Sequence, residues 1–155
     1  LVEDLLFLKE LNPHMIGIGP FLPHQATPFA DQPAGTLELT LFTLGLVRLM
    51  LPLSLIPATT ALSTLHPDGR KLGVLAGANV VMPNLSPQEN RKYYSLYDNK
   101  RCMGDDAAEG LALLRQEMAE IGYQVVFTQG NSKLPTEQED KHEPTKHTDG
   151  RSDSY

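Results

Sequence analysis

The hydrophobic residues of the first 83 positions follow two patterns that alternate along the chain. Short, continuous apolar runs are typical of parallel strands covered on both faces, and they occur at residues 14–19, 54–58 and 78–82. Longer segments repeat their apolar positions at helical spacing, and they predict helices over residues 1–11, 37–51 and 69–76. The pattern therefore predicts strand–loop–helix units in which the strands run parallel.

Capping and breaking residues mark the ends of these helices. The pair Asn12-Pro13 ends the first helix. Thr36 can cap the second, and Pro52 stops it. Gly77 fits the left-handed position that follows the third helix. Between the second strand and the third helix, Thr59-Thr60 reads as a polar turn, and Pro20, Pro23 and Pro28 predict a rigid loop after the first strand.

The second half of the chain begins with a helix start and ends in a polar tail. Ser86-Pro87-Gln88-Glu89 forms a capping box. The clearest helix covers residues 105–121 and ends at Gly122, and residues 123–127 could add one more strand. From residue 129 to residue 155 the composition is almost entirely polar, so this tail cannot bury enough apolar surface to become ordered. We predict that it is disordered.

This order of elements indicates an α/β fold, namely the C-terminal part of a (β/α)8 barrel. In such folds the chemistry gathers where the parallel strands end. The candidate site is therefore made by the segments that follow the strands, Gly19-Pro20-Phe21, Thr59-Thr60 and Pro83-Asn84. Three units alone would leave open sheet edges, which natural domains cover. We therefore expect further strands before Leu1.

Composition excludes several classes of function. The 155 residues carry a net charge of −6 and no basic run, which argues against nucleic-acid binding. No apolar stretch is long enough to span a membrane. The single cysteine, Cys102, cannot form an internal disulfide, a cysteine-rich zinc site or an iron–sulfur centre, and it suggests a reducing, cytoplasmic setting. His24 and His66 lack partners at metal-ligand spacing, so no metal site is predicted.

Three features each allow a functional and a structural interpretation. Gly17 and Gly19 could permit close approach of a ligand or merely relieve crowding. The hydroxyls of Thr59-Thr60 could bind an anion or belong to an ordinary turn. Tyr94 and Tyr97 share a helical face that could meet a ligand or pack into the core. These residues alone do not name a reaction.

Two stretches carry a resemblance to a known family. HMIGIGPFLPHQATPFA (residues 14–30) and IPATTALSTLHPDGRKLGVLAGANVVMPNLSPQENRKYYSLYDNK (residues 56–100) resemble the HydE maturases of FeFe hydrogenase, which are radical S-adenosylmethionine (SAM) enzymes close to biotin synthase and PylB. The resemblance covers about residues 1–128. It implies a complete (β/α)8 barrel whose N-terminal half carries a C-x3-C-x2-C loop for a 4Fe-4S cluster, and that loop is absent from this chain.

The resemblance also implies an activity and roles for particular residues. Such enzymes cleave SAM to a 5′-deoxyadenosyl radical, which here would act on an iron-carbonyl-cyanide-cysteine precursor of the hydrogenase H-cluster. Residues matching the SAM-binding strand are Met15, Ile18 and Phe21. Residues matching the substrate cavity are Thr59, Thr60, Met82, Tyr94 and Tyr97. Partners would be a small-molecule or organometallic substrate and the maturation proteins HydF and HydG. No catalytic residue can be named.

One departure from the family pattern concerns a second, peripheral cluster. Some members bind it through a cysteine matching Cys102 and two more, at positions held here by Gly110 and Leu113. We therefore predict that this cluster is absent.

We divide the chain into the last three strand–helix units of a barrel (1–101), a C-terminal helix and strand of the same domain (102–128) and the tail (129–155). The alternatives are a PylB-like or biotin-synthase-like enzyme and a non-catalytic, truncated half-barrel. Without the cluster loop, the chain alone should be inactive.

Overall fold

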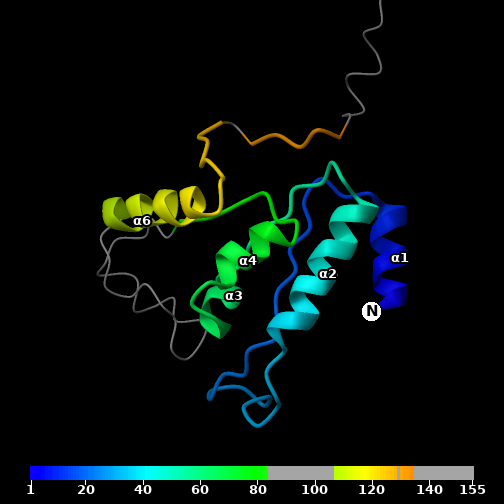
Figure 1. Cartoon of the computed structure of the whole chain (residues 1–155). Helices are drawn as coiled ribbons and strands as arrows, with labels where there is room; N and C mark the ends of the chain where they lie inside the picture. Colours follow the sequence, from blue (N-terminus) through cyan, green and yellow to red (C-terminus); the bar gives the residue numbers. More distant parts are fainter. Residues whose placement is uncertain (84–106, 129, 135–155) are drawn as a thin grey trace, which may run out of the picture.

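The computed structural model describes residues 1–83, 107–128 and 130–134. Its helices are α1 (Val2–Leu11), α2 (Leu37–Met50), α3 (Thr60–Leu65), α4 (Gly69–Leu75) and α6 (Ala107–Glu120) (Figure 1). The helix expected from Ser86, with Tyr94, Tyr97 and Cys102, lies outside the described residues, as does almost all of the polar tail.

The helix ends follow the signals in the sequence. Asn12 adopts the left-handed conformation (φ 45°) after α1, and its N–H donates to the Leu8 carbonyl. The Thr36 hydroxyl accepts a hydrogen bond from the Leu39 N–H at 3.2 Å, as an N-cap does. Gly77 follows α4 with φ 127°, a conformation that side chains with a Cβ rarely adopt. These predictions are confirmed.

The three predicted strands run parallel but do not form continuous ladders. They are joined by isolated parallel bridges, one between Met15 and Leu55 and one between Pro57 and Val80. Two residues explain the interruption. Pro57 has no N–H to donate, and the Ile56 N–H donates to the Asn79 side-chain oxygen at 2.8 Å rather than to a backbone carbonyl. The expectation of full strands is therefore wrong for the described residues, although the predicted neighbours and direction are correct.

The helices cover one face of these extended segments. The buried residues of this core come from the segments and from all five helices: Leu5, Ile16, Leu44, Val47, Leu51, Ile56, Ala58, Leu62, Val74, Ala78, Leu114 and Met118. Met15 and Met82 lie on the other face, where their side chains are 51% and 58% exposed. The segments therefore have one face packed on helices, whereas Met15 and Met82 on the other face are accessible.

Two further expectations are wrong. Thr59-Thr60 is not a turn, because Thr60 begins α3 and Thr59 is its N-cap residue. Residues 123–127 form no strand, and within the described part of the chain they pair with no other segment. Their only ordered backbone contact to the helix before them is the hydrogen bond from the Tyr123 N–H to the Met118 carbonyl at 2.9 Å.

Arg48 joins the end of α2 to the loops beside it. Its guanidinium donates to the carbonyl oxygens of Gly77 at 2.8 Å, Pro52 at 2.8 Å and Ser54 at 2.9 Å. Burial lowers the pKa of Arg48, but three carbonyl partners at hydrogen-bond distance favour the charged form. The side chain therefore holds both segment starts, at Ser54 and after Gly77, against one helix.

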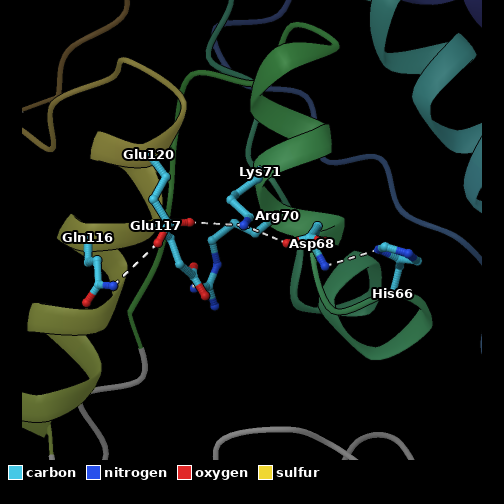
Figure 2. Close-up of polar contacts among 7 residues, drawn as sticks. All are labelled: His66, Asp68, Arg70, Lys71, Gln116, Glu117 and Glu120. Atoms are coloured by element: carbon cyan, nitrogen blue, oxygen red, sulfur yellow. Dashed lines mark hydrogen bonds and ion pairs between the residues drawn. The ribbon is translucent and has the colours of Figure 1, made fainter.

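Ion pairs dock α6 onto α4 (Figure 2). The Arg70 guanidinium contacts the Glu117 carboxylate at 2.7 Å. The Lys71 ammonium contacts Asp68 at 2.6 Å and Glu120 at 3.1 Å. Leu114 and Met118 of α6 are buried in the core beneath these pairs. The pairs are partly exposed, so they orient α6 more than they stabilise it.

The Gly77→Ala substitution should destabilise the protein by at least about 1 kcal/mol, since a Cβ would face both a left-handed backbone and the Arg48 side chain. The added Cβ would lie 2.7 Å from the Arg48 Cβ. Urea denaturation followed by circular dichroism measures the change. Gly110→Ala is the control, because a Cβ there meets nothing within 4 Å, and it should not destabilise. Equal stability of Gly77→Ala and the wild type would contradict this account.

The orientation of α6 should weaken at high pH. The Lys71 ammonium donates hydrogen bonds to the Asp68 and Glu120 carboxylates, and these bonds raise the pKa of Lys71. The contribution of this ammonium is therefore fully present below the ordinary lysine pKa and is lost as the pH rises through the raised value. The ε-methyl NMR signal of Met118 should shift as the pH rises above the ordinary lysine pKa of about 10.4. In Lys71→Met that shift should be absent, and an unchanged shift there would refute the assignment.

Candidate functional site

The candidate site lies where the three extended segments end. The bridges pair residue 15 with residue 55 and residue 57 with residue 80. Because side chains of extended segments alternate between two faces, continuing this register by steps of two residues aligns Gly19, Thr59 and Met82 across the three segments. All three belong to the face opposite the buried Ile16, Ile56 and Ala58. The sequence-predicted positions Thr59 and Met82 thus share one end and one face.

Thr59 carries an unpartnered polar atom at this end. Its hydroxyl oxygen is buried and has no hydrogen-bond partner in the structure. Although Thr59 holds the N-cap position of α3, its side chain makes no capping hydrogen bond. A buried, unpaired hydroxyl costs about 1–3 kcal/mol, and such groups call for an explanation such as a ligand. Neighbouring Thr60 is exposed, so only Thr59 presents a shielded hydroxyl.

The structure separates the roles of the two glycines. A Cβ on Gly19 would lie 2.9 Å from the Thr59 hydroxyl oxygen, so this glycine relieves crowding beside Thr59. A Cβ on Gly17 would meet nothing within 4 Å. Gly17 therefore presents bare backbone on the open face, where a ligand can approach closely.

The three positions matched to the SAM-binding strand divide between the two faces. Met15 and Phe21 are exposed, and Phe21 retains 46% of its accessible surface. Ile18 is partly buried and packs against the core beneath the helices. The structure therefore brings Met15 and Phe21 to the accessible side and does not bring Ile18 with them. Tyr94 and Tyr97 lie outside the described residues.

Sequence reasoning missed one aromatic residue at this end. The Phe29 ring lies edge-on to the Phe21 ring, with centroids 6.3 Å apart and planes at 83°. Both rings belong to the loop between the first segment and α2, which contains no helix, as the three prolines predicted. A signal was available, since Pro28-Phe29 repeats the Pro20-Phe21 pair eight residues earlier.

A hollow of about 610 Å³ lies between the third extended segment and α6. Its walls include Met15, Leu55 and Val80 from the segments and Leu114, Met118 and Phe127 from the other side. Neither Thr59 nor Phe21 lines it. Met15 therefore borders the hollow, whereas Thr59 and Phe21 lie outside it.

Metal-binding groups are not gathered in the part of the chain seen in the structure. Among the described residues, no three His, Cys, Asp or Glu side chains lie close enough together to hold a metal ion. In that same part, no helix is both long and apolar enough to cross a membrane.

Comparison with known proteins confirms the resemblance noted in the sequence. The chain is 52% identical over 103 residues to the [FeFe] hydrogenase maturase subunit HydE of Thermotoga maritima. The match covers 66% of this chain and 30% of that protein, so the chain spans less than a third of its curated relative. No protein-family model matches the chain. The similarity to HydE is thus established over two thirds of the chain.

Gly19→Ala should displace the Thr59 hydroxyl, since the new methyl group would overlap the hydroxyl oxygen. The χ1 angle of Thr59, measured by three-bond NMR couplings, should change in this variant. Gly17→Ala is the matched control on the same face and should leave Thr59 unchanged, because its methyl group enters open space. A Thr59 rotamer that is identical in all three proteins would show that position 19 does not constrain it.

Proposed function

We propose that this chain is the C-terminal part of a cytoplasmic, HydE-like radical SAM enzyme that matures the H-cluster of FeFe hydrogenase. The observation that carries the proposal is the 52% identity to a HydE over 103 residues. The aligned Gly19, Thr59 and Met82 support it, because they provide an open, partly polar end to parallel segments, the location of chemistry in α/β barrels.

One group of residues at this end contacts the substrate, and another group contacts SAM. Thr59 and Thr60 donate hydroxyl hydrogen bonds to the carboxylate of a cysteine-bearing, organometallic substrate. Met82 lines the same cavity with a polarisable thioether, and Tyr94 and Tyr97 complete it. Met15 and Phe21 contact the adenosyl group of SAM, since a thioether and an aromatic ring suit a flat heteroaromatic face. The Ile18 side chain packs against the core and so helps to hold the same segment in place.

The chain offers suitable residues for SAM but not for the 4Fe-4S cluster. The accessible Met15 and Phe21 suit SAM. A 4Fe-4S cluster needs cysteine thiolates, and the chain holds one cysteine, so this chain does not ligate the cluster by itself. When bound in the whole enzyme, the cluster would supply the electron that cleaves SAM to the 5′-deoxyadenosyl radical. This chain would therefore bind and orient ligands while the radical is generated elsewhere, and the substrate would pass between the enzyme and HydF or HydG.

A chimera tests the proposal. The 103 matched residues replace their counterparts in Thermotoga maritima HydE, and the purified, reconstituted chimera is assayed for SAM cleavage and for maturation of a hydrogenase. We expect both activities. SAM cleavage without hydrogenase maturation would favour the PylB-like or biotin-synthase-like alternative. An inactive chimera that folds and holds its iron would count against the proposal and favour a non-catalytic role.

Within this chimera, Thr59→Val should weaken substrate binding by about tenfold or more, since it removes a hydrogen bond to a charged group. The Michaelis constant for the substrate should rise while that for SAM stays unchanged. Thr64→Val is the matched control, because the Thr64 hydroxyl is already bonded to the Thr60 carbonyl at 3.2 Å. Equal effects of the two substitutions would remove Thr59 from the substrate site.

A further inference from the structure

The Phe21 ring sits in a loop whose two ends are tied together. The Gly35 N–H donates to the Phe21 carbonyl at 2.8 Å. A Cβ on Gly35 would lie 2.9 Å from the Phe21 nitrogen and 3.3 Å from the Pro20 Cα. These are backbone atoms, which cannot move aside as a side chain can. The closure therefore depends on glycine at position 35, and it fixes the backbone that carries Phe21.

The backbone of Phe29 is fixed just as closely. Its N–H donates to the Thr27 hydroxyl at 3.3 Å, and its carbonyl accepts from the Gln32 N–H at 3.0 Å. The Thr27 hydroxyl in turn donates to the His24 carbonyl at 2.9 Å. Each ring of the pair thus projects from a backbone held by hydrogen bonds within the loop, which keeps the two rings within contact of each other.

The ring pair is nevertheless half open to solvent. Phe21 is 46% exposed and Phe29 is 59% exposed. Apolar rings that serve only the core are normally buried, whereas an edge-on pair orients both rings and leaves surface free for a third group. The edge-on contact with Phe29 favours one orientation of the Phe21 ring in the free chain, which lowers the entropy lost on binding.

We propose that Phe29 is a positioning residue, which holds the Phe21 ring edge-on so that its free surface forms a platform for the flat heteroaromatic ring of a nucleoside. This inference rests on the proposed function, in which Phe21 contacts the adenosyl group of SAM. Phe29 itself does not touch the nucleoside. Its effect passes through the orientation of the neighbouring ring.

The test measures binding of S-adenosylhomocysteine, a stable analogue of SAM, to the full 155-residue chain by NMR of 13C-labelled aromatic rings. Phe21→Leu should abolish saturable binding. Phe29→Leu should weaken binding by about two- to tenfold, the factor that one aromatic pair contributes. Phe29→Tyr keeps the ring and should retain wild-type affinity. Phe42→Leu removes a similarly exposed ring, 62% accessible, from α2 and should change nothing.

A ring-specific signal separates positioning from general stability. Phe29 should shift the Phe21 ring protons in the free wild-type chain, and this shift should vanish in Phe29→Leu and persist in Phe29→Tyr. If Phe29→Leu does not fold, Phe29→Met replaces it as an apolar side chain without a ring. If folded Phe29→Leu or Phe29→Met binds S-adenosylhomocysteine with wild-type affinity while Phe21→Leu does not bind, the role of Phe29 is overturned. The proposed contact between Phe21 and SAM then still stands. Wild-type affinity in Phe21→Leu, or no saturable binding by the wild type, would overturn both this inference and the proposed contact with SAM.

Discussion

The parallel pairing of three short extended segments is the constraint on which the site depends. Two bridges, between residues 15 and 55 and between residues 57 and 80, set the register. Because the segments run in the same direction, all of them end on one side of the molecule. Thr59 therefore lies beside Gly19 although forty positions separate them in the sequence, and the close approach of these two residues is direct evidence of that register. Arg48 reinforces the arrangement by holding the loops that lead into the second and third segments.

The sequence was most informative where structure depends on neighbouring residues. The ends of α1, α2 and α4 follow from Asn12, Thr36 and Gly77, since caps and left-handed turns are determined within a few positions. Segment order and direction were also predictable, because continuous apolar runs separated by helices indicate parallel neighbours. Thr60 shows the limit of local reasoning. Its polar neighbourhood suggested a turn, yet α3 begins there, with Ala61 and Leu62 buried in the core.

The sequence predicted where the three extended segments end, but not which side chains near those ends are exposed. Met15, Phe21 and Met82 are exposed, and Thr59 lies at the end of the second segment. Their assignment as site residues rests on the resemblance to HydE and stays a prediction. Ile18 lies on the opposite face because successive side chains of an extended segment point to opposite sides. A short sequence motif does not reveal which of the two sides is buried. The contact between Phe21 and Phe29 was also unpredictable, since it requires the loop closure at Gly35 to bring two rings together across eight residues.

The bond between Ile56 and Asn79 joins the second and third segments at a point outside the candidate site. Between most neighbouring strands the separation is dictated by the backbone and is the same for every sequence. Here an amide side chain stands in for one backbone carbonyl, beside three backbone hydrogen bonds that join the second and third segments. A change from asparagine to a residue without a side-chain acceptor would leave the Ile56 N–H unpaired while those backbone bonds remain. Evolution could in this way adjust how firmly the third segment is held without changing any residue of the candidate site.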